Sequence, residues 1–184
     1  LKRKQKKGQP IRKDGPEWQI EAKKGTPTMG GTLILFSLIV STLLWTDISN
    51  IFIWLLIFIT VGFGLIGFID DYLKLSKNSH KGLPGKVKLF LQIVFSFLFS
   101  FLLFYYSNED YTYITFPVFK NLLINIGYFW FLFSMLVIVG SSNAVNLTDG
   151  LDGLAIVPIV IVTASLAIIS YLVGNSIFSE YLNL

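Results

Sequence analysis

Residues 51–69 read IFIWLLIFITVGFGLIGFI, and the next five residues, 70–74, read DDYLK. The first stretch has no charged residue and matches the ~20 apolar residues that a helix needs to cross the hydrocarbon core of a membrane. Two carboxylates and a lysine stand directly at its end. The junction predicts a membrane helix that carries polar, functional residues where it leaves the bilayer.

Other apolar blocks of similar length occur along the chain. Together with the first they predict spans at about 30–46, 51–69, 87–106, 122–140 and 154–173. Hydrophobic residues make up 53% of the chain, above the ~45–50% that is usual for soluble domains even when Gly is counted. We therefore expect an all-α fold: a polytopic transmembrane helical bundle with about five membrane helices, in a single membrane domain over residues 1–184. The chain has no Cys, which excludes disulfides and Cys-ligated metals within it.

The distribution of positive charge predicts the orientation. Nine of the 15 Lys and Arg residues precede the first block, and none lies between the first and second blocks. Four lie between the second and third blocks, and a fifth, Lys88, is the second residue of the third. Loops rich in Lys and Arg stay in the cytoplasm. We expect residues 1–29 to be a cytoplasmic basic loop and the loops 70–86 and 141–153 to be cytoplasmic too, the last by counting spans. Nucleic-acid binding by the basic N-terminal run would need a soluble domain to present it, so we expect no nucleic-acid partner.

Three polar clusters fall on this predicted cytoplasmic side. The first is KKGTPTMGG, residues 23–31, in which Gly allows close backbone approach to a ligand and a helix start favours anions. A plain loop before a helix explains the same residues, and both readings stay open from the pattern alone.

The second cluster is Asp70-Asp71, followed by Lys74. A helix C-terminus carries partial negative charge, so two Asp residues there need a compensating cation. Lys74 or a divalent ion would serve, and oxygen ligands suit Mg²⁺ shared with a phosphate. Hydrated interfacial carboxylates are the alternative. Nearby, His80 is expected to be a solvated loop residue, and Gly62, Gly64 and Gly67 are expected to be helix-packing positions.

The third cluster is NAVNLTDGLDG, residues 143–153, in which Asn143, Asn146, Asp149 and Asp152 recur every three residues. Successive members of such a series turn by about 60° on a helix and can form one polar strip. Ordinary capping residues in a loop are the alternative. Carboxylates, lysines and Gly-rich backbone at a membrane surface suit a phosphorylated substrate. A transporter is the rival from another class, but its charges are expected nearer the middle of the membrane.

Taken together, TPTMGG at 26–31, DDYLK at 70–74 and residues 143–153 resemble the polyprenyl-phosphate N-acetylhexosamine-1-phosphate transferases, as does GQPIRKDGP at 8–16. The form of the first and third motifs is most similar to the branch of that family that uses UDP-N-acetylmuramoyl-pentapeptide. The resemblance implies a ten-helix fold, of which this chain would correspond to helices two through six. It would then lack a third essential Asp region and a His-rich loop, and the 184-residue chain alone is expected to be inactive.

The reaction that the resemblance implies is transfer of phospho-N-acetylmuramoyl-pentapeptide from UDP to undecaprenyl phosphate, which gives lipid I and UMP with Mg²⁺ as cofactor. This is the first membrane step of peptidoglycan synthesis, and its expected place is the cytoplasmic face of the bacterial cytoplasmic membrane. A relative that transfers N-acetylglucosamine-1-phosphate is the alternative within the family. A homodimer is left open.

The resemblance also implies roles for individual residues. Asp70, Asp71 and Asp149 would be catalytic, with Asp71 and Asp149 as metal ligands. A phosphate monoester has a second pKa near 6, so positioning the lipid phosphate is a more economical role for Asp70 than removing a proton. The expected substrate-binding residues are Lys23, Lys24, Thr28, Lys74, Lys86, Asn143, Asn146, Leu147, Gly150 and Asp152.

Overall fold

The computed structural model describes residues 30–77, 82–107, 112–116, 119–149 and 154–182. The chain forms two compact units, Leu1–Val139 and Gly140–Leu184. The predicted cytoplasmic loop 1–29 lies outside the described residues.

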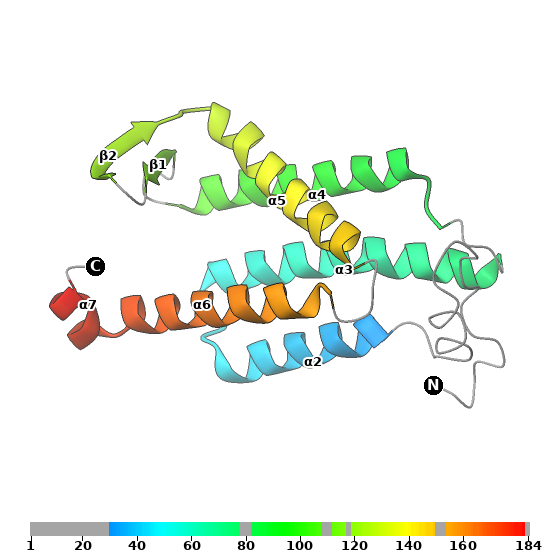
Figure 1. Cartoon of the computed structure of the whole chain (residues 1–184), viewed down its shortest axis with the longest axis horizontal. Helices are drawn as coiled ribbons and strands as arrows, with labels where there is room; N and C mark the ends of the chain where they lie inside the picture. The colour runs from blue at the N-terminus through cyan, green and yellow to red at the C-terminus, as the bar shows by residue number, and fades with distance from the viewer. Residues whose placement is uncertain (1–29, 78–81, 108–111, 117–118, 150–153, 183–184) are drawn as a thin grey trace. The chain divides into compact units, whose positions relative to one another are not determined.

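Three helices form the body of the first unit: α2 (Gly30–Trp45), α3 (Ile51–Ser76) and α4 (Gly85–Tyr106). Helix α3 lies between α2 and α4 (Figure 1). Asn50 caps the start of α3, where its side chain accepts a hydrogen bond of 2.9 Å from the Phe52 N–H. At the start of α4, the Pro84 carbonyl accepts the N–H groups of Val87 and Lys88.

Close approach of these helices depends on small residues in α3. The Phe95 ring of α4 lies against Gly62, and the Leu35 side chain of α2 lies against Gly64. Both glycines therefore serve as the predicted packing positions, which is how membrane helices commonly approach each other. Gly67 has open space around it, so the structure does not bear out a packing role there.

A polar seam runs along the buried side of α4. Gln92, Ser96 and Ser100 occur at intervals of four residues, and all three are buried. The Ser100 and Ser134 hydroxyls lie 2.7 Å apart and link α4 to the next long helix, α5 (Phe129–Thr148). Large apolar side chains are exposed over most of the described helices instead. This arrangement, in which small and polar groups face other helices and apolar groups face outward, suits a lipid environment.

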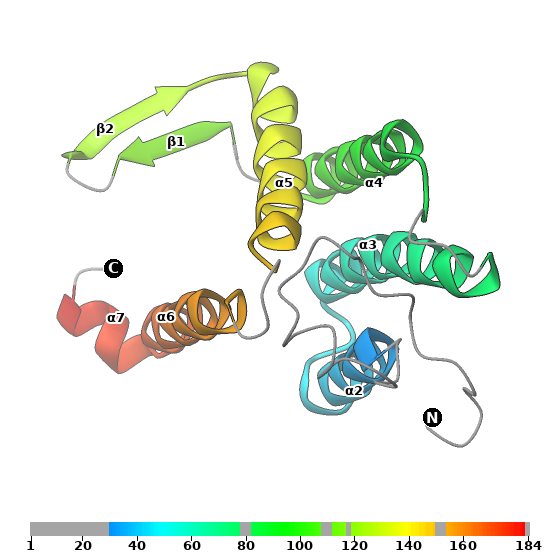
Figure 2. The same cartoon turned by 45° about the vertical axis from the view of Figure 1, so that its right-hand side comes forward.

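A β-hairpin separates α4 from α5. Strands β1 (Tyr113–Phe116) and β2 (Phe119–Asn125) run antiparallel (Figure 2), with Tyr113 opposite Asn125. The predicted span 122–140 is therefore wrong at its start, because residues up to Asn125 belong to a strand. The chain turns at Gly127, whose φ of 52° favours glycine, before α5 begins. An apolar run alone does not distinguish a buried strand from a helix.

Two further predicted boundaries are corrected. Helix α5 continues to Thr148, so much of the predicted loop 141–153 is helical. Helix α3 continues to Ser76, so the predicted loop 70–86 begins inside a helix. In the second case, Lys74 pairs with carboxylates three and four residues earlier, and such pairs support a helix.

The second unit contains the end of α5, then α6 (Ile156–Gly174) and the short α7 (Ser176–Leu182). The Asn175 side chain caps α7 by accepting a hydrogen bond of 3.1 Å from the Ile177 N–H. The sequence did not predict α7 as a separate helix. The span expected at 154–173 corresponds closely to α6.

Four helices of the described residues are long and apolar enough to cross a membrane: α3, α4, α5 and α6. The predicted all-α membrane fold is confirmed. Helix α2 has only 16 residues, about 24 Å at the usual rise, against a hydrocarbon core of ~30 Å. The fifth span therefore stays a prediction. Helix α3 is about 39 Å long by the same rise, and its excess length falls at the polar end, Asp70–Ser76.

Candidate active site

The polar end of α3 holds a compact ionic cluster. The Lys74 ammonium lies 2.5 Å from Asp70 Oδ2 and 3.1 Å from Asp71 Oδ1. The helix creates this arrangement, because residues three and four positions apart lie on the same face. The side chains of Asp70, Lys74 and Asp71 are 16%, 23% and 42% exposed, respectively. The cluster is therefore partly shielded from water, with Asp71 as its most accessible member.

The segment before α4 completes the surroundings of Asp70. The Leu83 N–H donates a hydrogen bond of 2.7 Å to Asp70 Oδ1. Gly82 lies so close that a Cβ at that position would be 2.7 Å from Asp70 Cγ and 2.9 Å from Lys74 Cε. Both carboxylate oxygens of Asp70 thus receive a donor from the protein, one from α3 and one from the segment before α4.

These contacts keep the carboxylate charged. Partial burial raises the pKa of Asp70, but the hydrogen bonds from Lys74 and Leu83 and the charges of Lys74 and Lys88 outweigh it, so its pKa lies below the ordinary value. For Lys74, burial lowers the pKa, and the two carboxylates more than offset this, so its pKa lies above the ordinary value. The pairing of Asp70 with Lys74 therefore favours the charged form of both groups.

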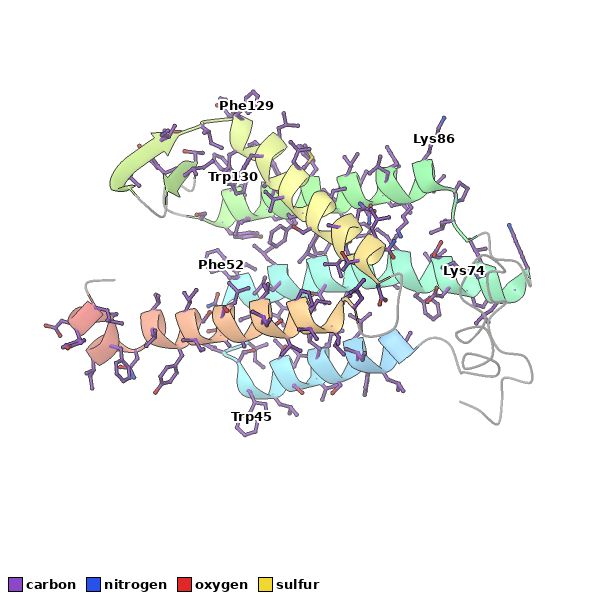
Figure 3. The ribbon with its side chains drawn as sticks, in the orientation of Figure 1. Trp45, Phe52, Lys74, Lys86, Phe129 and Trp130 are labelled. Atoms are coloured by element: carbon purple, nitrogen blue, oxygen red, sulfur yellow. The ribbon has the colours of Figure 1, made fainter. Side chains whose placement is uncertain are left out.

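The two lysines at the start of α4 differ in their exposure and in their relation to Asp70. Lys86, an expected phosphate ligand, is exposed, and Figure 3 shows its side chain pointing away from α3. The structure does not bring Lys86 to Asp70, and its role stays a prediction. Lys88 is only half-exposed and is the α4 lysine whose charge acts on Asp70. The sequence analysis missed Lys88, Gly82 and Leu83. These residues lie in the sequence KGLPGKVK at 81–88. Nothing in that sequence by itself indicates that it contacts Asp70.

In the second unit, the end of α5 carries the predicted polar strip as far as Asp149. The Asp149 N–H donates to the Val145 carbonyl at 3.1 Å, so the helical hydrogen-bond pattern reaches this residue. Asn143, Asn146 and Asp149 therefore follow one another with turns of about 60°. Asn143 is half-buried, whereas Asn146 and Asp149 are exposed. Leu147 is 80% exposed, and its proposed contact with the nucleotide stays a prediction.

The remaining candidate residues lie outside the described part of the chain. They are Lys23, Lys24, Thr28, Gly150 and Asp152. The structure therefore neither joins them to the ionic cluster nor separates them from it.

Asp71 is the member of the cluster that best fits a metal ion. Asp70 uses both oxygens for protein donors, whereas Asp71 gives one oxygen to Lys74 and is the more exposed carboxylate. Among the described residues, no group of three or more His, Cys, Asp or Glu side chains comes together. Mg²⁺ commonly takes one or two carboxylates, with waters and substrate phosphates completing its shell. A single accessible carboxylate would suit Mg²⁺ shared with the phosphates of a substrate, and Mg²⁺ binding at Asp71 stays a prediction.

Comparison with known proteins assigns this arrangement to a family. The model of glycosyl transferase family 4 matches residues 53–182, which is more than half of the chain and contains the Asp70–Lys74 cluster. The chain belongs to glycosyl transferase family 4. A second match, phospho-N-acetylmuramoyl-pentapeptide-transferase signature 1, covers residues 23–35 and so includes the Gly-rich motif before α2.

Individual bacterial proteins are similar over nearly the whole chain. A protein of Rickettsia montanensis is 56% identical over 180 residues, which cover 98% of this chain and 50% of the relative. Proteins of Rickettsia felis and Rickettsia massiliae are 54% identical over the same coverage. Each is named phospho-N-acetylmuramoyl-pentapeptide-transferase. The chain spans about half the length of the curated relatives it matches. This membership and the four long apolar helices identify a bacterial membrane protein.

Proposed function

We propose that this chain forms part of an enzyme that transfers phospho-N-acetylmuramoyl-pentapeptide from UDP to undecaprenyl phosphate, with lipid I and UMP as products. The observation that carries the proposal is the 56% identity, over 98% of the chain, to a protein named for this transfer. The match of residues 23–35 to a signature of the same name supports it independently of overall identity.

The reaction is a phosphoryl transfer. A phosphate oxygen of the lipid forms a bond to the sugar-linked phosphorus of the donor, and the bond from that phosphorus to the bridging oxygen of UMP breaks. Such reactions need positioning and charge neutralisation more than covalent participation by the protein. The lipid phosphate is mostly deprotonated at neutral pH, because its second pKa is near 6. A base would therefore contribute little.

Lys74 is the residue we expect to meet a phosphate directly. Its ammonium has three donors, and two of them are directed to Asp70 and Asp71. Within the described part of the chain, the third meets no acceptor and is available to a phosphate oxygen. In this view Asp70 positions Lys74, so that the cation is oriented before the substrate arrives. The sequence analysis predicted that Asp70 positions the lipid phosphate itself; in the present proposal it does so through Lys74.

Magnesium would supply further charge neutralisation at the transferring phosphates. Asp71 would hold it, and Asp149 is the other proposed ligand. Asn143, Asn146 and Leu147 on α5, with Gly150 and Asp152 beyond it, are proposed for the nucleotide. Lys23, Lys24 and Thr28 are proposed for phosphates. The basic loops support a site on the cytoplasmic face. The proposed membrane spans are those predicted from the sequence, with their ends moved to the observed ends of the helices.

The test uses the complete reading frame in membranes supplied with undecaprenyl phosphate and Mg²⁺. UMP release is followed with UDP-N-acetylmuramoyl-pentapeptide and separately with UDP-N-acetylglucosamine. We expect release with the first donor only. Release with the second donor only would assign the protein to the N-acetylglucosamine-1-phosphate branch. No release with either donor, from folded protein, would refute the transferase.

A further inference from the structure

The segment before α4 contacts the carboxylate of Asp70 through a backbone N–H. Leu83 contributes its N–H, at 2.7 Å from Asp70 Oδ1, and the two residues are thirteen positions apart in the chain. Such a contact is not a consequence of the α3 helix, which would form without it. It is a tertiary contact directed at one oxygen of one carboxylate.

Residue 82 makes this contact sterically feasible. A Cβ at Gly82 would lie far inside the normal van der Waals contact distance to Asp70 Oδ1 and at 2.7 Å from Asp70 Cγ. It would also lie 2.9 Å from Lys74 Cε. Either the carboxylate rotates away or the segment withdraws, and both movements break the hydrogen bond from Leu83. Among the described glycines, only Gly127 has a positive φ, so Gly82 is not needed for an unusual backbone conformation. Glycine is required at residue 82 because it has no side chain.

Gly85 offers a comparison three residues further along. It is the first residue of α4, and a Cβ there would meet no atom within 4 Å. The requirement for a bare backbone is thus confined to the residue beside Asp70. It does not extend to every glycine of the GLPG sequence at 82–85.

We propose that Gly82 and the Leu83 N–H form a backbone clamp that positions the Asp70 carboxylate, and through it the Lys74 ammonium, for phosphate binding. This inference rests on the proposed function. One Asp70 oxygen is fixed by the clamp, so the other is directed at Lys74. Loss of the clamp would free the carboxylate to rotate, and the ammonium would lose its fixed orientation. Gly82 is a positioning residue and does not touch the substrate.

The first test measures transfer by the complete protein carrying Gly82→Ala, with Gly85→Ala as the matched control. We expect kcat to fall roughly tenfold to a hundredfold in Gly82→Ala, since small misplacements in a site cost up to ~10²-fold, with a smaller change in KM for the nucleotide donor. Gly85→Ala should retain the wild-type rate. A wild-type kcat in Gly82→Ala would overturn the clamp.

A double-mutant cycle separates positioning from general damage to the fold. If Gly82 acts through Asp70, adding Gly82→Ala to Asp70→Asn should cost little beyond Asp70→Asn alone, because coupled residues are not additive. Full additivity of the two losses would show that Gly82 acts elsewhere and would overturn the proposal. The melting temperature of each variant, measured in the same detergent, identifies any loss that comes from unfolding.

Hydrogen exchange provides a readout that does not depend on activity. The Leu83 amide should exchange slowly in the wild type and in Gly85→Ala, and faster in Gly82→Ala and Asp70→Ala, because its acceptor is displaced or removed. Equal exchange in all four proteins would overturn the clamp. Absence of UMP release from the wild type with either donor would instead defeat the proposed function, and these two failures are distinguishable.

Discussion

The packing of α3 against α4 predicts the effect of a single methyl group at Gly62. In Gly62→Ala, the new Cβ would lie 2.5 Å from Phe95 Cδ1, 2.8 Å from Cε1 and 3.1 Å from Cγ. Favourable carbon–carbon contacts lie at about 3.5–4.0 Å, so the ring or the helices must move by around 1 Å. The ring cannot swing freely, because it packs against Phe58 with centroids 5.8 Å apart.

Overpacking of this kind costs about 1–3 kcal/mol. At about 2 kcal/mol, the unfolding equilibrium of the first unit would change roughly thirtyfold, since 1.4 kcal/mol is tenfold. The measurement is unfolding of the complete protein in detergent, followed by circular dichroism. We expect Gly62→Ala to unfold at a lower temperature than the wild type.

Gly67→Ala is the matched control, because Gly67 lies in the same helix and a Cβ there meets nothing within 4 Å. It should be neutral or stabilising, since Ala favours a helix by up to about 1 kcal/mol over Gly. Shortening the ring in Gly62→Ala with Phe95→Leu should recover part of the loss. Equal melting temperatures for Gly62→Ala and Gly67→Ala would show that the α3–α4 contact is not as tight as described.

Three further predictions concern the site and the polar seam. Lys74→Met should reduce kcat and raise the pKa of the Asp70 carboxyl, because Lys74 lowers that pKa against the effect of burial; the measurement is an NMR titration of the labelled Asp70 carboxyl, and an unmoved titration would contradict this. Ser134→Ala should destabilise the protein by about 1–3 kcal/mol, measured by thermal unfolding, because the fully buried Ser100 hydroxyl loses its partner at 2.7 Å; an unchanged melting temperature would argue against that bond. Asp149→Asn should reduce UMP release about a hundredfold, a typical loss for a group that stabilises charge in the transition state, and a wild-type rate would remove Asp149 from the site.

The site could be predicted in part because its α3 members are close in sequence. Asp70, Asp71 and Lys74 lie within one and a half turns of a helix, so their spacing alone places them on one face. The pattern of Asn143, Asn146 and Asp149 follows the same rule. The contribution of Gly82 and Leu83 was not predictable in this way, because a backbone N–H leaves no mark in the residue type of its donor.

The sequence by itself determined that this is a membrane protein with helices of spanning length, where most of those helices lie and where its acidic groups gather. These properties depend on the length of apolar runs and on charge, which are local quantities. The tertiary structure decided that Asn125 ends a strand, since an apolar run fits a strand or a helix until its partner is known. It also decided that Leu83 and Lys88 act on Asp70, because α4 folds back beside α3 and brings together residues that the sequence separates.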